Sequence, residues 1–437
     1  MPSTSRRALA LLFGMLAGCH RPYVVPPGSA PQTIIMNVSV IDGLGGARRL
    51  ANVLLDGDRI SAVGRLRPGV GDQVIDGRGL VLAPGFIDTQ STLDRGILFL
   101  RDVPDAVSQG VTTVVIGGAG ESVHPLRPLF DSLRRSPASV NVASYVGHRS
   151  LRAAVLGGDD MRPAKPPELA QMKIELSHDL GAGALGLSGA LERDSAGTAA
   201  FAELMELSRV AADSTGRFSA ANRGGGSAFP VIRGFARLAT EVRIPSQVGL
   251  WQTRVAISCE PSACPARGKE RYLDASDSLA AILDRARASG LQVTAAVCVH
   301  ADGTTPGIVE WPYAVFCNGS GQRDSRPYVP SFLWGLGQMT RDRKALSLEL
   351  AIRKSTSLAA ATIGVQDRGA ILPGQYADLV LFEEALVQNI PPSGTTSSPP
   401  GAIRAVWVNG IVVYRNGQPT GAHPGRVLLR VGVSSDR

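Results

Sequence analysis

The feature that most constrains the fold is an alternation of short apolar stretches and amphipathic segments between residues 83 and 369. Eight of the stretches are typical of strands, namely residues 85–88, 112–116, 141–146, 184–187, 218–221, 247–251, 292–297 and 313–316. Helical periodicity separates them, as in residues 168–180, where Met172, Leu176 and Leu180 lie on one stripe and Gly181 follows as a stop. Eight strand–helix units in about 285 residues match the size of a (β/α)8 barrel.

The sequence pattern at both ends of the chain differs from that of the middle. Residues 33–41, 51–55, 59–63 and 74–75 are typical of strands separated by glycine-containing turns. Strand patterns return at 378–382, 405–408 and 411–414, the last two joined by Asn409-Gly410, a strong hairpin signal. We therefore expect an α/β protein: a barrel over residues 83–369, beside a small β-sandwich built from residues 32–82 plus 370–437.

The first residues have the order of a secretory signal. Arg6 and Arg7 precede an apolar run at residues 8–16 that is too short to span a bilayer. The sequence Leu-Ala-Gly-Cys at residues 16–19 resembles the lipobox of bacterial lipoproteins, which implies cleavage after residue 18 and acylation of Cys19. We expect a signal peptide at 1–18, a tether at 19–31 and a periplasm-facing lipid anchor in the bacterial cell envelope. The alternative is an ordinary signal peptide with a chance cysteine.

Net charge and amino-acid composition limit the classes of partner that we expect. The formal net charge of +8 falls to +6 when residues 1–18 leave with their two arginines. Aromatic residues make up only 5% and no dense basic run occurs, so nucleic acid is not an expected partner. The membrane, through the lipid anchor, is the expected contact.

Four cysteines remain after Cys19, and an exported protein can form disulfides. They are Cys259, Cys264, Cys298 and Cys317. Their even number is compatible with two disulfides, of which Cys259–Cys264 closes the shortest loop. Four free buried thiols and, less readily, a zinc knuckle are the alternatives.

Several segments together resemble one enzyme family. They are LVLAPGFIDTQSTLD at 80–94, GVTTVVIGGAGES at 110–122, NVASYVGHRSLR at 141–152, GALGLSGAL at 183–191 and the stretch 346–382. They resemble the amidohydrolase superfamily, and within it the N-acyl-D-amino-acid deacylases (D-aminoacylases), over nearly the whole mature chain. The resemblance implies hydrolysis of a carbon–nitrogen bond by a zinc-bound hydroxide at the C-terminal mouth of the barrel.

The metal-ligand positions of that family are substituted in this chain. By the resemblance, the ligands of strands one, two, five, six and eight fall on Gln90 and Thr92, Ala119, Ala221, Gln247 and Asn318. None of these side chains is an imidazole, a thiolate or a carboxylate, and an amide cannot act as a general base. We therefore predict no cofactor where the family carries zinc. We also predict that the six vestigial positions converge in one pocket.

Four further residues are pocket candidates: Asp94, His148, Arg223 and His300. Arg223 would be the natural partner for a ligand carboxylate. His148 and His300 could instead form a rebuilt acid/base or metal centre, although a buried histidine bonded to the backbone is the plainer interpretation of His148.

Three functions follow as hypotheses. The first is a catalytically degenerate lipoprotein, a pseudoenzyme that binds a small N-acylated or carboxylate ligand. The second is an active hydrolase of carbon–nitrogen bonds with a site rebuilt around His148 and His300. The third is a structural envelope lipoprotein. The residues leave the ligand and the oligomeric state open.

Overall fold

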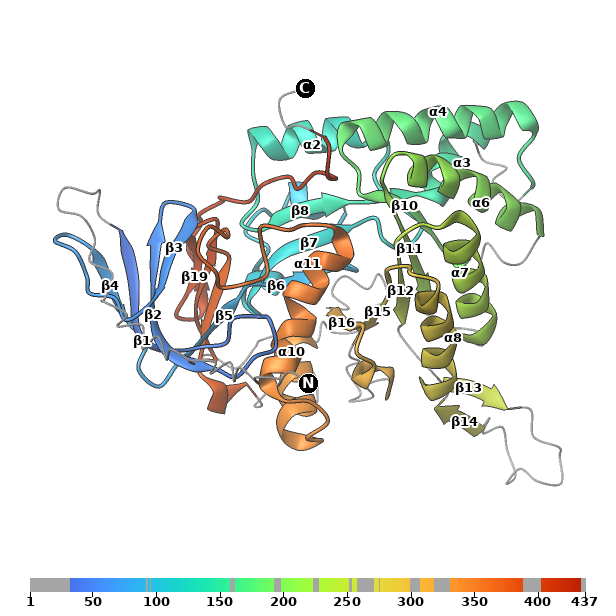
Figure 1. Ribbon diagram of the computed structural model, residues 1–437. Coiled ribbons are helices and arrows are strands. Elements are labelled where there is room, and N and C mark those ends of the chain that lie inside the picture. The colour runs from blue at the N-terminus through green and yellow to red at the C-terminus, as the bar shows by residue number, and fades with distance from the viewer. Residues whose placement is uncertain are drawn as a thin grey trace, which may run out of the picture.

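A computed structural model describes residues 32–91, 93–94, 96–157, 162–191, 198–222, 228–250, 254–257, 271–274, 276–298, 307–317, 331–387 and 402–433. The described chain forms a β lobe and a barrel lobe side by side (Figure 1). No helix in these ranges has the length and apolar content that crossing a bilayer requires.

Parallel strands form the barrel, and each lies within two residues of a stretch expected from the sequence. They are β6 (Phe86–Asp88), β7 (Val111–Ile116), β8 (Asn141–Ser144) continued by β9 (Val146–Gly147), β10 (Gly186–Gly189), β11 (Arg217–Asn222), β12 (Ser246–Leu250), β15 (Val293–Cys298) and β16 (Ala314–Cys317). Neighbours pair in chain order, always in parallel, and β16 contacts β6. The predicted (β/α)8 barrel is confirmed.

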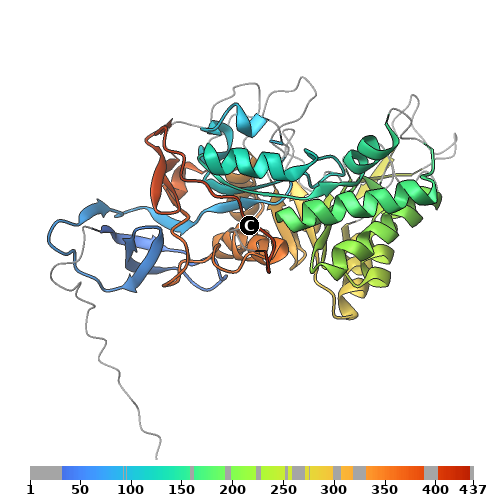
Figure 2. The same cartoon turned by 90° about the horizontal axis from the view of Figure 1, so that it is seen from above.

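Helices cover the outside of the barrel (Figures 1 and 2). They are α1 (Pro104–Val107), α2 (Leu126–Arg135), α3 (His148–Leu156), α4 (Pro166–Ala182), α6 (Thr198–Asp213), α7 (Ala228–Val242), α8 (Ser276–Ala288), α9 (Ser331–Gly337), α10 (Leu348–Ser355) and α11 (Ser357–Ile363). The stripe expected on α4 is buried at Met172, Leu176 and Leu180. This helix ends two residues later than expected, because Gly183, not Gly181, takes the left-handed conformation at φ 111°.

Short elements lie between the strands and helices of both lobes. They are the 3-10 turns at Gly96–Leu98, Gly307–Glu310 and Glu384–Leu386, a π-turn at Gln338–Asp342, and the antiparallel pair β13 (Arg254–Ile257) and β14 (Arg271–Asp274). A disulfide joins Cys298 to Cys317, which face each other across β15 and β16. Cys259 and Cys264, the pair favoured from the sequence, lie outside the described residues.

Strands from the two ends of the chain share the β lobe. They are β1 (Thr33–Val40), β2 (Arg49–Asp56), β3 (Arg59–Gly64), β4 (Gln73–Asp76), β5 (Val81–Pro84), β17 (Leu379–Phe382), β18 (Ile403–Val408), β19 (Ile411–Arg415) and β20 (Gln418–Pro419). Their order is β20-β19-β18-β17-β5-β1-β2-β3, with β4 on β1. One apolar core contains both Val53 of the first segment and Trp407 of the last. The composite sandwich is confirmed; the domain boundaries stay a prediction.

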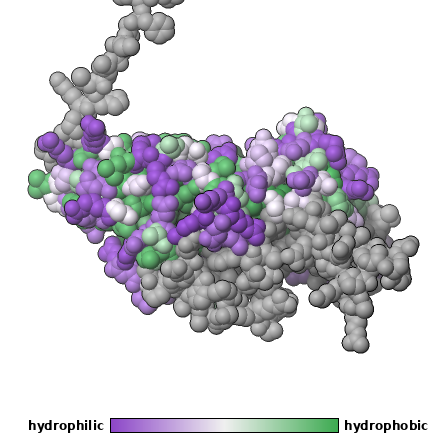
Figure 3. Space-filling view, turned by 90° about the horizontal axis from the view of Figure 1, so that it is seen from below, coloured by the Kyte–Doolittle hydropathy of each residue, from purple (hydrophilic) through white to green (hydrophobic). Residues whose placement is uncertain are grey.

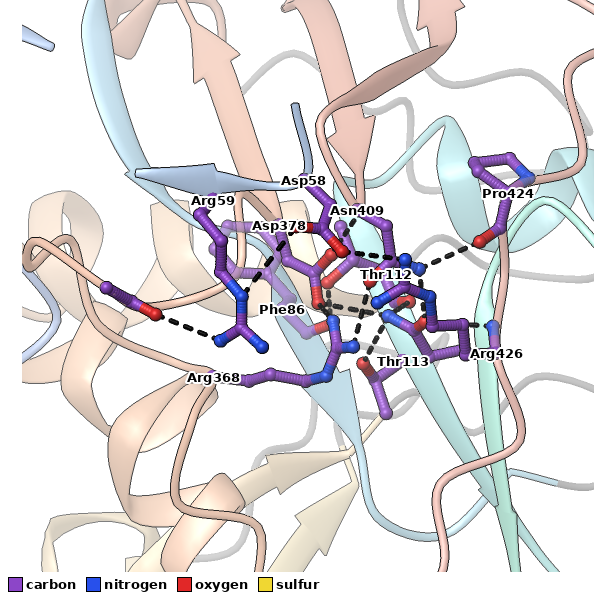
Figure 4. A network of polar contacts seen from close by, with 12 residues as sticks. Asp58, Arg59, Phe86, Thr112, Thr113, Arg368, Asp378, Asn409, Pro424 and Arg426 are labelled. Carbon is purple, nitrogen blue, oxygen red and sulfur yellow. Dashed lines mark hydrogen bonds and ion pairs between the residues drawn. The ribbon is translucent and has the colours of Figure 1, made fainter. Parts of the chain in front are cut away.

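A buried polar network fastens the β lobe to the barrel (Figure 4). The Asp378 carboxylate accepts hydrogen bonds from Asn141 Nδ2 at 3.0 Å, from the Asn409 backbone N–H at 2.7 Å, and from Arg368. Asn409 Nδ2 donates in turn to Asn141 Oδ1 at 2.9 Å. Because Asn141 begins β8, this network ties the β18–β19 hairpin to a strand of the barrel.

We predict that Asp378→Ala lowers the free energy of unfolding by about 3–5 kcal/mol, because it leaves the buried Arg368 guanidinium without its carboxylate. Denaturant titration of the purified protein measures this change. Asp131→Ala removes a half-exposed carboxylate that pairs with Arg134 and should cost about 1 kcal/mol or less. Equal losses in the two variants would contradict the proposed role of the network.

Candidate binding site at the barrel mouth

Four polar side chains form a hydrogen-bonded cluster inside the barrel. Gln90 Nε2 donates to Ser219 Oγ at 3.0 Å and to Gln247 Oε1 at 3.2 Å. Gln247 Nε2 donates to Thr89 Oγ1 at 3.0 Å. Each of the four residues is at most 3% exposed. We call Thr89, Gln90, Ser219 and Gln247 the amide cluster.

The amide cluster joins strands that are far apart in the sequence. Thr89 and Gln90 directly follow β6, Ser219 lies on β11 and Gln247 lies on β12. Ser219 Oγ also donates to the Gly118 carbonyl, 2.8 Å away in the loop after β7. In a parallel barrel such side chains point into the lumen near the mouth, where ligands bind.

Glycines make room for the Gln90 amide. A Cβ atom on Gly249 would lie 3.1 Å from Gln90 Cδ, and one on Gly118 would lie 3.2 Å from Gln90 Oε1. Both distances are tighter than ordinary van der Waals contact. A side chain at position 118 or 249 would therefore force the Gln90 amide to shift by a few tenths of an ångström.

The structure brings together the vestigial positions that it describes. Gln90 and Gln247 touch directly, and Ala221 pairs with Gly249, which lies against Gln90. Ala119 follows Gly118, whose carbonyl belongs to the same hydrogen-bonded group. Thr92 and Asn318 lie outside the described residues.

The side chains at these four positions do not fit zinc. Ala119 and Ala221 have no donor atom, and the two glutamine amides are engaged with each other and with hydroxyl groups. Zinc sites in proteins use imidazole, thiolate and carboxylate ligands. Within the part of the chain that the structure describes, no three His, Cys, Asp or Glu side chains come together as a metal site.

His148 lies at the first position of α3, immediately after β9, and is fully buried. Its Nε2 is 2.7 Å from Glu203 Oε1 on α6, and Arg152 Nη1 donates to both oxygens of the same carboxylate at 2.7 Å. Burial raises the pKa of Glu203, but the hydrogen bonds from His148 and Arg152 outweigh it and hold that pKa below its usual value. His148 thus has a carboxylate partner, where the sequence suggested a backbone group or an open pocket.

The other pocket candidates have different outcomes. Asp94 Oδ1 accepts a hydrogen bond from the Gly117 backbone N–H at 2.9 Å, so the carboxylate joins the loop after β6 to the end of β7. Arg223 and His300 lie outside the described residues.

Two members of the amide cluster, Thr89 and Ser219, were not foreseen as site residues. A signal for Ser219 existed in the sequence, because Ser219 and Ala221 are two apart on one strand and share the face that enters the barrel. Thr89 carried no comparable signal, since its role depends on Gln247 in a strand 158 positions away.

Fold and site together define an amidohydrolase-type (β/α)8 barrel with a composite β-sandwich. A model of the Amidohydrolase family matches residues 320–414. N-acyl-D-aspartate deacylase of Alcaligenes xylosoxydans xylosoxydans is 31% identical, across 90% of this chain and 94% of its own length. D-aminoacylase of the same organism is 28% identical, across 90% and 96%.

Solved structures agree with these relatives. A crystal structure of D-aminoacylase superposes with a TM-score of 0.76 and 27% identity, covering 91% of this chain and 99% of the other. N-acyl-D-glutamate deacylase from Bordetella bronchiseptica, complexed with zinc and a phosphonate inhibitor, has the same fold at a TM-score of 0.77 and 24% identity, covering 92% and 100%. The chain belongs to the D-aminoacylase family of the amidohydrolase superfamily.

We predict that Gln90 and Gln247 are energetically coupled. Gln90→Ala and Gln247→Ala should each lower the free energy of unfolding by about 1–3 kcal/mol, because each leaves buried hydrogen-bonding groups unsatisfied. The double variant should lose about 0.5–3 kcal/mol less than the sum, measured by a double-mutant cycle in denaturant. Gln171→Ala, on the exposed side of α4, is the control and should combine additively with Gln90→Ala. Additivity of the two buried changes would refute the coupling.

Proposed function

We propose that this chain is a non-catalytic member of the D-aminoacylase family that binds a small ligand at the barrel mouth. The observation that carries the proposal is the hydrogen bond between Gln90 and Gln247, at two positions where the family resemblance places metal ligands. The ligand class suggested by the relatives' names is an N-acyl-D-amino acid.

The physical argument rests on what an amide can and cannot do. It neither binds zinc as imidazole does nor takes up a proton at neutral pH, so the amide cluster cannot supply the hydroxide and the base that this hydrolysis needs. An amide does donate and accept hydrogen bonds, and an N-acyl amino acid presents an amide and a carboxylate. The two glutamine amides already bond to each other and are at most 3% exposed, so we place the ligand on the mouth around the amide cluster, where it would be bound without cleavage.

An active hydrolase with a site rebuilt around His148 and His300 is the competing proposal. The contact between His148 and Glu203 favours it, because a carboxylate-oriented histidine is the usual form of a general base. Arg152 weighs against it, since its guanidinium shares the same carboxylate and the imidazole is completely buried. A purely structural envelope lipoprotein, the third hypothesis, would bind no small ligand.

Ligand binding, metal content and turnover distinguish these proposals. We expect protein prepared in zinc-supplemented medium to hold less than stoichiometric metal, and N-acetyl-D-amino acids to release no amino acid over hours. We expect the same compounds to raise the melting temperature, since ligand at about a hundred times its dissociation constant stabilises the folded state by about 2.7 kcal/mol. The N-acetyl-L-amino acids are the matched control.

Each competing result is distinct. Amino-acid release that His148→Gln abolishes would establish the rebuilt hydrolase. Stoichiometric zinc would refute the claim that the mouth does not accept metal. The absence of a thermal shift with the whole D series would leave the structural lipoprotein as the function.

We further propose that the chain is exported and anchored to the bacterial envelope, facing the periplasm, through acylated Cys19. The support is the order of charged, apolar and small residues before Cys19, and the lipobox-like Leu-Ala-Gly-Cys itself.

We predict that protein extracted from bacterial membranes begins at Cys19 and carries a diacylglyceryl group on the sulfur. Mass spectrometry of the tryptic peptide Cys19–Arg48 tests this, because trypsin does not cleave between Arg21 and Pro22 and the next basic residue is Arg48. The Cys19→Ser variant should yield no acylated peptide. An unmodified Cys19, or a mature end elsewhere, would refute the anchor.

A further inference from the structure

One outer face of the β lobe combines exposed aliphatic and arginine side chains. It consists of Leu50, Arg65, Arg67, Val70 and Val74, and we call it the tether face. Val70 is 104% exposed, Leu50 77% and Val74 53%. Figure 3 shows hydrophobic residues standing among hydrophilic ones on the lobe at its left, which holds β1 to β4.

Strand pairing places Leu50 and Val74 on the same side of the sheet. Leu54 of β2 and Val74 of β4 are both partners of Ile34, and Leu50 lies four residues before Leu54 on β2, on the same face. Directly paired residues share a face. Ile34 packs in a small apolar cluster separate from the main core of the lobe, so this face is the outer one.

Residues 65–72 cross this outer face and carry the other members. Leu66 is 6% exposed and packs in the cluster of Ile34, while Arg65 and Arg67 on either side of it are exposed. Asn52 Nδ2 donates to the Leu66 carbonyl at 2.8 Å, which holds the start of the segment against β2. The arginine side chains therefore project away from the sheet.

Asp72, near the end of this segment, binds Gln32, the first described residue after the tether. The Asp72 carboxylate accepts hydrogen bonds from the Gln32 backbone N–H at 3.0 Å and from the Gly69 backbone N–H at 2.6 Å. Gln32 is thus fixed beside Val70. The thirteen residues from Cys19 to Pro31 can reach at most about 45 Å.

We propose that the tether face lies on a phospholipid bilayer. The nearness of this face to the membrane rests on the proposed anchor at Cys19. The chemistry of its side chains supports membrane contact independently of the anchor. Aliphatic side chains partition to the boundary between lipid headgroups and acyl chains, and guanidinium groups bind phosphate with paired hydrogen bonds. Among the described residues, no carboxylate forms an ion pair with Arg65 or Arg67.

Acidic groups on the same lobe offset the positive charge of the arginines and so weaken the electrostatic attraction to anionic lipid. Asp56 and Asp76 are exposed, and Asp76 pairs with Arg78 at 2.5 Å. Asp72 is occupied by two backbone donors. The face is therefore close to neutral, and its contact with lipid depends on the aliphatic side chains and on phosphate binding more than on net charge. Figure 1 places β4 at the end of the molecule away from α7 and α8, so the barrel would stand clear of the membrane.

The first experiment measures depth in the bilayer. Acylated protein carrying Val70→Trp is reconstituted in vesicles of phosphatidylcholine and phosphatidylglycerol, and its fluorescence is compared with that in vesicles of brominated lipid. We expect a blue-shifted emission and strong quenching at this position. Val431→Trp, at a residue 61% exposed near the C-terminus, is the control and should be quenched no more than the parent protein. Equal quenching in the two variants would overturn the proposal.

The second experiment removes the anchor. The mature chain with Cys19→Ser, which alters none of the described residues, is co-sedimented with the same vesicles. Val70→Asp should weaken binding about tenfold or more, the factor expected for losing one buried valine. Arg65→Gln with Arg67→Gln should weaken it about fivefold for each arginine. Val431→Asp is the control.

Three results would overturn the proposal. In the second experiment they are vesicle binding that Val70→Asp leaves unchanged, and no binding by any form of the chain. In a separate sedimentation velocity run without vesicles, the third is self-association that Val70→Asp abolishes, which would assign the face to a second copy of this chain. An unmodified Cys19 would refute the anchor alone, and the co-sedimentation result would still decide the surface.

Discussion

The Asp378 carboxylate is the interaction on which the arrangement of the two lobes depends. It accepts hydrogen bonds from Asn141 of the barrel, from Asn409 in a turn of the β lobe, and from Arg368 in the segment between α11 and β17. All four residues are at most 5% exposed, so each polar group needs its partners to offset the loss of water. Satisfying these groups together requires one relative position of sandwich and barrel. The mouth of the barrel is built on that frame.

Much of the fold could be predicted because its signals are local. A barrel strand buried on both faces is a short apolar run, and its helices carry a 3.6-residue period, so both kinds of element stand out in the sequence. The exact ends of strands and helices, which depend on packing against neighbouring elements, were harder to predict from the sequence. The third strand divides around Tyr145 into β8 and β9, and α4 continues past Gly181 to Ala182. In an apolar sequence, packing rather than propensity decides such ends.

The site was only partly predictable, for a related physical reason. The family resemblance located Gln90 and Gln247, but not Thr89 or Ser219, which complete their hydrogen bonds. His148 was located without Glu203, 55 positions away. Nothing in the sequence around Lys354 indicated that it is buried. Its ammonium group donates to the Trp311 and Ala314 carbonyls, and burial lowers its pKa to about 7. Hydrogen-bond partners distant in the sequence become visible only when the strands are assembled.

The surroundings of Gln90 show how the amides at positions 90 and 247 fit between the strands of the barrel. A site that had merely lost its ligands would leave polar groups without partners or a void between strands, and both are costly in a buried place. Gln90 instead donates to two acceptors, and Gly118 and Gly249 leave the space its amide occupies. The hydrogen bonds of Gln90 link the end of β6 to β11 and β12, a cross-strand connection of the kind that a shared metal ion makes. The amides at positions 90 and 247 therefore form one consistent packing solution between the strands.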